Sequence, residues 1–458
     1  MLNYDVKILI FIFSNLITLH MTLKKLLFVI LDGIAGRPCE EFNGLTPLEA
    51  ANTPNLDYLA KNGQTGEITI IDERTPPQSD PAVLALFGYD PIIYSKSRGP
   101  LEAIGSGINF NEGDLALRCN FATIEGRKII DTRAGRIDGE TAKKIVDFIQ
   151  ENLKLNSFPV DMNFVHTLNY RTLLILHPRK GKLSDQISNT NPGYERLPGY
   201  MELPKPDLKE KMLEESRPLD DTEESLSSAT LVNEFTEKSR ELLKSNEINL
   251  DRIKQGVNPA NIILMRGAGT SLPRLENFKE KFGTTWLCIG DTPGERGIAK
   301  LLGMELLKDL PDPYVDMLSK KSSVEEIDDA IKKDMEVRVR KLLDNLENYD
   351  CFYIHIKGAD PFGHGGLPES KKRTIEGIDK WFFDELLKKI DLDNTTICVT
   401  SDHSTPCSLK AHSADPVPLL ISGNNFKPDS VEKFGESFCK NGSIGKIKAT
   451  QLMSILIK

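Results

Sequence analysis

The sequence is poor in cysteine, and the few cysteines show no pairing pattern. There are seven of them in 458 residues, scattered along the chain, with no C-x-x-C arrangement. An odd number of scattered cysteines argues against a disulfide framework, which small secreted proteins use for stability. We therefore expect free thiols and a reducing, cytoplasmic location.

The chain also lacks an excess of positive charge. It has 58 lysines and arginines against 67 aspartates and glutamates, a formal net charge of -9. This excludes a general nucleic-acid binder, because contacts to phosphates need a basic face. It does not exclude a small phosphorylated substrate, since bound metals and a few arginines can reverse the field locally.

No apolar run is long enough to cross a bilayer, which takes about 20 residues. Residues 8–18 are strongly apolar but shorter, and they lack the basic flank and small-residue cleavage site of a signal peptide. Met21 and the Thr-Leu-Lys-Lys after it read as a second start. We expect residues 1–22 to be a disordered or misassigned extension, with an anchor or a signal peptide as alternatives, and no stable membrane association.

Short apolar runs alternate with helical patterns at both ends of the chain. The pattern over 323–346 has apolar residues three or four apart and a capping box, Ser323-Val-Glu-Glu326. Another helix is expected over 372–390. This alternation predicts an α/β fold, a mainly parallel sheet with helices on both faces. The expected strands are 26–31, 286–289, 351–356, 395–400 and 417–421.

The middle of the chain has a different texture. It contains strand patterns of its own and a polar stretch, 180–228, that is rich in proline. The length of the chain favours two domains, and chemically suggestive motifs occur both before and after the middle. We therefore expect an inserted α+β domain, 107–282, within a catalytic domain made of 23–106 and 283–458.

Three aspartates lie just past predicted strands. They are Asp32, Asp360 and Asp402. A single aspartate at a strand end is usually a turn or cap residue. However, the carboxyl ends of parallel strands meet at one edge of a sheet, which is where ligands gather. Three acids there, two of them with a histidine within four residues, indicate a metal centre.

Histidines and one serine complete the inventory. His364, His403 and His412 accompany the acids, and Ser79 opens a helical run before Asp-Pro. A serine there is normally an N-cap, yet the start of a helix also attracts anions. Three Asp, three His and one Ser suit two divalent metals around a serine nucleophile. The other histidines considered, His166, His177 and His355, are interpreted as structural.

The motifs together resemble the alkaline-phosphatase superfamily, and within it the archaeal-type 2,3-bisphosphoglycerate-independent phosphoglycerate mutases. The resemblance runs from about residue 24 to the carboxyl end. The matching segments are Val29-Ile-Leu-Asp-Gly33, Ser79-Asp-Pro-Ala-Val-Leu-Ala-Leu-Phe-Gly-Tyr-Asp-Pro91, Arg98-Gly-Pro-Leu-Glu-Ala103, Arg118-Cys-Asn-Phe-Ala-Thr123, Thr132-Arg-Ala-Gly-Arg-Ile137, Leu183-Ser-Asp-Gln-Ile187, Arg266-Gly-Ala-Gly269, His355-Ile-Lys-Gly-Ala-Asp360 and His412-Ser-Ala-Asp-Pro-Val-Pro418.

The resemblance implies two groups of metal ligands and a set of substrate-binding arginines. One group is Asp360, His364 and His412, and the other is Asp32, Ser79, Asp402 and His403. Manganese is usual in relatives, with magnesium, cobalt or zinc possible. Arg133, Arg136 and Arg266 would belong to the inserted domain, face the cleft and hold the substrate. No bisphosphoglycerate is needed.

The resemblance also implies a reaction, the interconversion of 3-phosphoglycerate and 2-phosphoglycerate in glycolysis and gluconeogenesis through a phosphoserine at Ser79. The sequence departs from relatives at Gly365-Gly366-Leu367 and around 308–314, which leaves substrate-side contacts open. The alternatives are a related phosphomonoesterase, a homoserine-kinase-like phosphotransferase, or a metal-stabilised binding protein that has lost activity. The oligomeric state cannot be predicted.

Overall fold

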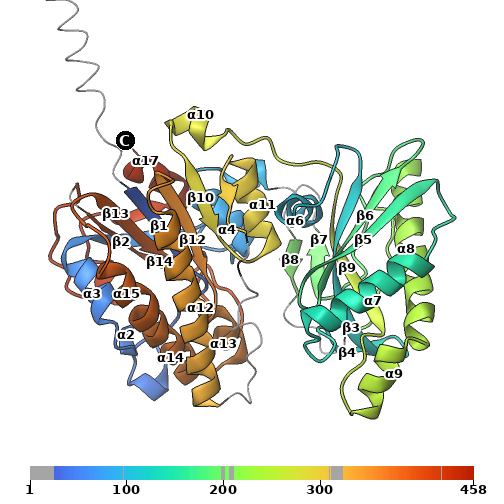
Figure 1. Ribbon diagram of the computed structural model, residues 1–458, viewed down its shortest axis with the longest axis horizontal. Coiled ribbons are helices and arrows are strands. Elements are labelled where there is room, and N and C mark those ends of the chain that lie inside the picture. Colours follow the sequence, from blue (N-terminus) through green and yellow to red (C-terminus); the bar gives the residue numbers. More distant parts are fainter. Residues whose placement is uncertain are drawn as a thin grey trace, which may run out of the picture.

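In a computed structural model, the chain forms two lobes, each built on its own sheet (Figure 1). The structure describes residues 25–95, 97–196, 202–205, 211–308, 310, 323–423 and 425–457. The predicted extension, 1–22, and most of the departure at 308–314 lie outside these ranges. Among the described helices, none is both long and apolar enough to cross a bilayer. All seven cysteines are free and buried, which confirms the expectation of free thiols.

The larger sheet has eight strands in the order β11-β10-β12-β1-β13-β14-β2-β15. Strand β1 pairs in parallel with β12 on one side and with β13 on the other. Among the described strands of this sheet, β14 alone runs antiparallel to its neighbours. The predicted, mainly parallel sheet is confirmed. Its strands are β1 (Lys25–Leu31), β2 (Gly63–Thr69), β10 (Trp286–Ile289), β11 (Glu305–Leu306), β12 (Cys351–Ile356), β13 (Thr395–Thr400), β14 (Val417–Ser422) and β15 (Gly445–Lys448).

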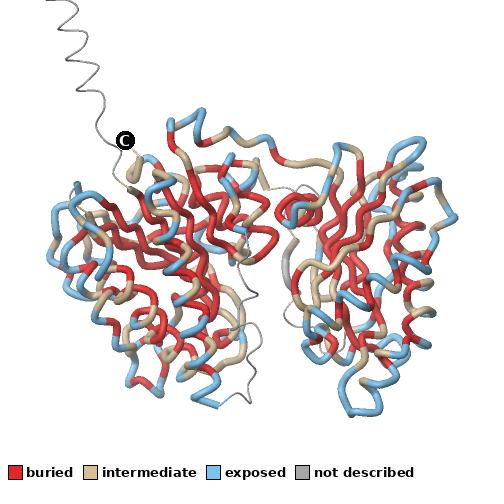
Figure 2. Tube along the Cα trace, viewed as in Figure 1, coloured by how far each residue is buried: buried red, intermediate tan, exposed pale blue. Residues whose placement is uncertain are grey.

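Helices cover both faces of this sheet, as the sequence predicts. Alternate residues of β1 enter two separate cores, because successive side chains of a strand point to opposite faces. Figure 2 shows the buried strands between the helical layers. Helices of one face are α2 (Pro47–Ala50), α3 (Pro54–Lys61), α12 (Val324–Asn345), α14 (Pro368–Ile378), α15 (Asp384–Leu387) and α16 (Glu436–Cys439). Helices of the other are α4 (Ser79–Leu86), α6 (Arg98–Gly105), α10 (Phe278–Phe282), α11 (Pro293–Leu301) and α17 (Leu452–Leu456).

Two helix predictions have different outcomes. Helix α12 begins after the Ser323 cap, and the predicted capping box with Glu326 is present. The helix expected over 372–390 is confirmed in its main part, since the chain is helical from Pro368 to Leu387, but the π-helical turn within it was not predicted. There the chain forms α14, then a π-helical turn at Asp379–Phe383, then α15. Asp379 Oδ1 accepts a hydrogen bond from the backbone amide of Leu56 at 2.8 Å. This contact with α3 fixes the chain at the residue where the π turn begins.

The smaller sheet lies entirely between residues 115 and 269, and all its pairings are antiparallel. Helices α7 (Gly139–Asn152) and α8 (Glu223–Lys244) bury their apolar faces against it. The domain boundaries expected at 106/107 and 282/283 stay a prediction. The strands are β3 (Leu115–Glu125), β4 (Lys128–Asp131), β5 (Val160–Leu168), β6 (Arg171–Pro178) and β9 (Ile262–Gly269), and beside them lie β7 (Tyr194–Arg196), β8 (Glu202–Pro204), and α9 (Glu247–Lys254).

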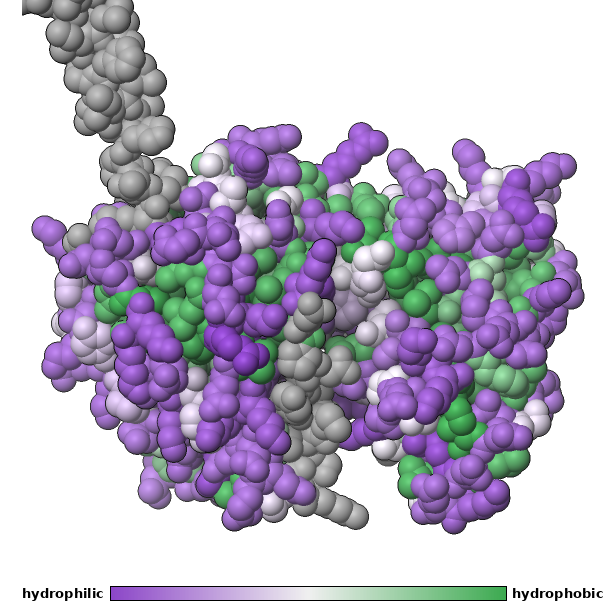
Figure 3. Space-filling model, in the orientation of Figure 1, coloured by the Kyte–Doolittle hydropathy of each residue, from purple (hydrophilic) through white to green (hydrophobic). Residues whose placement is uncertain are grey.

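Helix α6 lies between the two lobes (Figure 1). It packs against α11 on one side and against β3 and β9 on the other. The approach to α11 depends on glycine, since a Cβ at Gly105 would lie 1.9 Å from the carbonyl oxygen of Pro293. Side chains on α6 are therefore held at the junction of the two lobes. Most of the surface seen in Figure 3 is hydrophilic.

Candidate metal centre and adjoining cavity

Two buried acids and a histidine meet at the carboxyl ends of β1 and β13. Asp32 follows β1 directly, and Asp402 and His403 follow β13 after one residue. His403 Nε2 lies 3.3 Å from Asp32 Oδ1 and 3.2 Å from Asp402 Oδ2. The amides of Gly33 and His403 donate to Asp402 Oδ1 and fix that carboxylate. The structure thus brings together three of the four residues expected in the second metal group.

A second group lies beside the first, on α13 (Ala359–Gly365) and the segment after β13. His364 Nε2 and His412 Nε2 each lie 3.4 Å from Asp360 Oδ1. The rings of His412 and His403 stack with their centroids 3.6 Å apart. The hydroxyl of Thr405 donates to Asp360 Oδ1 at 2.8 Å and lies 3.0 Å from His403 Nδ1. The two groups therefore form one continuous cluster.

The chemistry of the cluster fits divalent metal ions. Asp32 Oδ1, Asp402 Oδ2 and His403 Nε2 are buried, and none has a hydrogen-bond partner among the described residues. Atoms of Asp32, Asp402 and His403 lie within 4.8 Å of one another, as do atoms of Asp360, His403 and His412. Buried polar atoms are costly unless something binds them, and carboxylate oxygen with imidazole nitrogen suits several divalent metals.

Backbone carbonyls orient two of the imidazoles. His364 Nδ1 lies 3.0 Å from the carbonyl oxygen of Lys410, and His412 Nδ1 lies 2.7 Å from that of Pro77. A carbonyl can only accept, so each Nδ1 carries the proton. Each Nε2 then faces Asp360 and is the nitrogen that can bind a metal once it carries no proton.

The crowded acids perturb one another. Burial raises the pKa of Asp32 to about 8, and Asp402 adds to that rise. Burial opposes the charged form of His403, but Asp402 outweighs it and raises the pKa of His403 to about 9. Metal binding would lower both pKa values, since metal ligands must be deprotonated.

Ser79 is the first residue of α4, and the N-cap position belongs to Gln78. Ser79 therefore does not take the capping role that a serine at a helix start normally has. Within the described part of the chain its hydroxyl makes no hydrogen bond, and the residue is half-buried. The carbonyl of Pro77, two residues earlier, accepts from His412. The roles of Ser79 as nucleophile and as metal ligand stay predictions.

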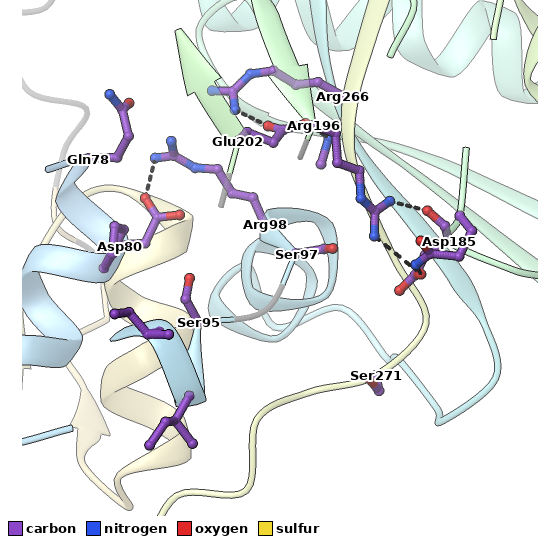
Figure 4. Close-up of a pocket in the computed structure, with 15 residues that line it drawn as sticks. Gln78, Asp80, Ser95, Ser97, Arg98, Asp185, Arg196, Glu202, Arg266 and Ser271 are labelled. Carbon is purple, nitrogen blue, oxygen red and sulfur yellow. Dashed lines mark hydrogen bonds and ion pairs between the residues drawn. The ribbon is translucent and has the colours of Figure 1, made fainter. Parts of the chain in front are cut away.

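A cavity of about 350 Å³ adjoins the start of α4 and is lined from both lobes (Figure 4). Gln78 and Asp80, on either side of Ser79, contribute to its wall. Three arginines line it, each paired with an acid. Arg98 Nη2 lies 3.1 Å from Asp80 Oδ1, Arg196 Nη2 lies 3.2 Å from Asp185 Oδ1, and Arg266 Nη1 lies 2.6 Å from Glu202 Oε2. The cavity wall therefore carries three arginines and three acids, paired one to one.

The arginines expected to hold the substrate lie in two different parts of the structure. Arg266 lines the cavity, and its guanidinium lies 3.9 Å from the centre of the Tyr194 ring. Arg133 and Arg136 lie in an exposed turn between β4 and α7 and are not among the described residues that line the cavity. Arg136 has a positive φ of 56°. The substrate roles of all three stay predictions.

Several residues at the site were not identified from the sequence. Arg98 and Arg196 line the cavity, and Glu295 and Lys357 join Asp32 below the metal cluster. His355, interpreted as structural, lies 3.7 Å from Asp402 Oδ2. A signal was available for part of this set. Tyr353, His355 and Lys357 alternate along one strand, and this spacing places polar side chains on one face of a buried sheet.

Curated relatives match nearly the whole chain. A family model described as 2,3-bisphosphoglycerate-independent phosphoglycerate mutase matches residues 60–249. A protein of that name from Thermococcus kodakarensis is 38% identical over 437 residues, which cover 95% of this chain and 97% of the relative. One from Methanopyrus kandleri is 34% identical over 438 residues, covering 94% and 96%.

Solved structures agree with these relatives. The PH0037 protein from Pyrococcus horikoshii has a TM-score of 0.71 and 30% identity, covering 94% of this chain and 96% of that one. The cofactor-independent phosphoglycerate mutase from Thermoplasma acidophilum has a TM-score of 0.56 and 28% identity, covering 94% and 98%. The chain belongs to the 2,3-bisphosphoglycerate-independent phosphoglycerate mutase family.

Proposed function

We propose that the chain interconverts 3-phosphoglycerate and 2-phosphoglycerate without 2,3-bisphosphoglycerate, through a phosphoserine at Ser79. The observation that carries the proposal is the cluster of buried, unpartnered carboxylate and imidazole atoms beside the start of α4, in a chain of this family. An arginine-lined cavity next to that cluster offers room for a small phosphorylated acid.

Two divalent ions fit the donor sets. Asp360, His364 and His412 would hold one ion, and Asp32, Asp402, His403 and Ser79 would hold the other. When bound, they supply positive charge for the phosphoryl oxygens and acidify the serine hydroxyl. We propose manganese as the metal, although magnesium, cobalt and zinc also accept oxygen and nitrogen ligands.

Ser79 acts as the phosphoryl carrier in this proposal. A bond forms between its Oγ and phosphorus while the bond from phosphorus to the 3-oxygen of glycerate breaks, and the serine proton passes to that leaving oxygen. The reverse step with the 2-hydroxyl gives 2-phosphoglycerate. Unsatisfied amides in the first turn of α4 and its helix dipole favour an anion there. Positioning and charge dominate such transfers.

Glycerate must stay bound while it reorients. We assign this task to residues 107–282 acting against the catalytic part, 23–106 and 283–458. Arg266, in the cavity wall, is the principal contact in this proposal, and Arg133 and Arg136, in the exposed turn, are weaker contacts. Arginine suits the task because its planar guanidinium binds a carboxylate in two places. Water must stay out during reorientation, since hydrolysis of the phosphoserine would turn the mutase into a phosphatase.

Phosphorus NMR on purified protein supplied with 3-phosphoglycerate and manganese tests the proposal. We expect the 2-phosphoglycerate signal to grow while inorganic phosphate stays near its background. Release of phosphate without any 2-phosphoglycerate would instead support a metal-dependent phosphomonoesterase. The absence of both products would contradict phosphoryl chemistry on this substrate.

A further inference from the structure

A third set of buried groups, Lys357, His355, Glu295 and Asp32, adjoins the metal cluster and shares Asp32 with it. Lys357 follows β12, two residues after His355, so both side chains point to the same face of the sheet. Asp32 directly follows the neighbouring strand β1, and Glu295 comes from the first turn of α11. Asp32 is the only member of this set that the proposed reaction uses.

The set has the ligand types and spacing of a cation site. Asp32, Glu295 and His355 each offer an atom, and these three atoms lie within 4.8 Å of one another. All three residues are buried. Glu295 Oε2 has no hydrogen-bond partner among the described residues, although the residue is 2% exposed. Two carboxylates and an imidazole suit a divalent ion.

The ammonium of Lys357 lies between these three side chains. Lys357 Nζ donates to Asp32 Oδ2 and, at 2.5 Å, to Glu295 Oε1, and it lies 3.4 Å from His355 Nε2. An ammonium carries three donors and no acceptor, so His355 Nε2 presents its lone pair to it. The proton of His355 then lies on Nδ1, 2.8 Å from the Tyr353 hydroxyl. All three donors thus meet acceptors.

We propose that the ammonium of Lys357 occupies a third cation site, formed by Asp32, Glu295 and His355, beside the two-ion centre. Lys357 is a positioning residue in this view. It holds Oδ2 of Asp32 and leaves Oδ1, the unpartnered oxygen, facing His403 and the ions. A cation attached to the chain cannot be removed by a chelator, so Asp32 stays oriented when the ions are lost. The inference rests on the two-ion centre of the proposed function.

Replacing Lys357 by methionine tests the inference, because methionine has a similar length and no charge. Asp32 and Glu295 are then left buried without a counter-ion, and we expect one additional divalent ion to bind per chain. The measurement is the manganese content of gel-filtered protein by plasma mass spectrometry. The double variant Lys357→Met with Glu295→Gln should return to the count of the unmodified protein, and Lys357→Arg should not gain an ion.

Lys371→Met is the matched control. Lys371 is also fully buried, but its ammonium donates to the carbonyl oxygens of Ala35 and Thr405 rather than to acids. Its loss should add no ion. If Lys357→Met does not fold, Lys357→Gln carries the same test, since it too removes the charge.

The two proposals fail in different ways. An unmodified protein that binds no divalent ion would overturn the two-ion centre and this inference with it. An unmodified protein that binds ions, together with charge-removing Lys357 variants whose count is equal or lower, would overturn the inference alone. A gain that survives Glu295→Gln would place the additional ion elsewhere and also overturn it.

Discussion

The metal cluster and the arginine-lined cavity lie side by side but are built in opposite ways. In the cluster, Asp32 Oδ1, Asp402 Oδ2 and His403 Nε2 are buried without hydrogen-bond partners. In the cavity, each of three arginines already has an acid of the chain as its partner. The cluster leaves these three atoms unpartnered, although Lys357 pairs with the other oxygen of Asp32, whereas the cavity pairs each arginine within the chain.

The difference predicts different binding behaviour. Unpartnered buried acids are costly, so an ion that neutralises them should bind tightly and stabilise the fold. An arginine that exchanges an internal carboxylate for that of a substrate gains little net energy, because one charge-assisted contact replaces another. The cavity should therefore bind and release its ligand readily, as a turnover site needs, while the ions stay.

The largest expected effect is the loss of turnover in Ser79→Ala. The hydroxyl is the proposed phosphoryl carrier, so mutase activity should fall to background and no phosphoserine should be trapped. Stability should change by no more than about 0.5 kcal/mol, as at a site without special contacts, because Ser79 is not the N-cap. Trapping with labelled substrate and thermal melting measure both. Ser95→Ala, which also borders the cavity, is the control. Normal turnover in Ser79→Ala would rule out the covalent route.

Asp402→Asn should separate folding from metal binding. The substitution keeps an oxygen for the amides of Gly33 and His403 but puts an amide nitrogen where Oδ2 faces His403. Manganese affinity should fall by more than the about 10- to 100-fold that losing an outer contact costs. A calorimetric titration with manganese gives the affinity. Unchanged affinity would show that this carboxylate is no ligand.

Arg266→Ala should impair turnover more than Arg136→Ala, because Arg266 lines the cavity and Arg136 lies in an exposed turn. Losing a charge-assisted contact costs about 1.5–3 kcal/mol, roughly a ten- to hundred-fold effect on glycerate retention. In Arg266→Ala the ratio of free phosphate to 2-phosphoglycerate should rise by that factor. If Arg136→Ala raises it as much, the exposed turn reaches the substrate during turnover. The position of the cavity would then be a poor guide to substrate contacts.

Much of the larger sheet could be predicted from the sequence because its signals are local. Apolar runs identify β1, β12 and β13, and the rule that ligands gather at strand ends predicts that Asp32 and Asp402 meet. Tertiary pairings gave no local signal. Lys357 and Glu295 are 62 residues apart, and only the packing of α11 on the sheet brings them together.

The arginines show the same limit. The Arg266 segment was identified by a motif, but its partner Glu202 lies 64 residues away in a different strand. Arg98 was seen within a matching segment, yet its place at the lobe junction depends on the close packing of α6 against α11. Neither the partner of Arg266 nor the position of Arg98 can be deduced from the spacing of residues along the chain.

The smallest expected effect on turnover at neutral pH belongs to Glu102→Gln, whose main result should be a pH-dependent loss of stability. Glu102 Oε1 accepts from Arg98 and Arg118, both at 2.9 Å, and its side chain is 2% exposed. Burial raises the pKa of Glu102, but Arg118 and Arg98 outweigh it and lower the pKa below its ordinary value of 4.5. Removing one partner of such a buried pair costs about 3–5 kcal/mol.

The sign of the pH dependence follows from that lowered pKa. The folded protein binds the Glu102 proton less tightly than the unfolded chain does, so the carboxylate stabilises the fold above pH 4.5. The stabilisation is lost as the pH falls further, through the folded-state pKa. The difference in melting temperature between the unmodified protein and Glu102→Gln should therefore be largest near pH 7 and shrink below pH 4.5. Glu125→Gln, at the exposed end of β3, is the control. A difference that does not change with pH would mean that Glu102 acts through packing alone, and the arginines of the cavity wall would not depend on its charge.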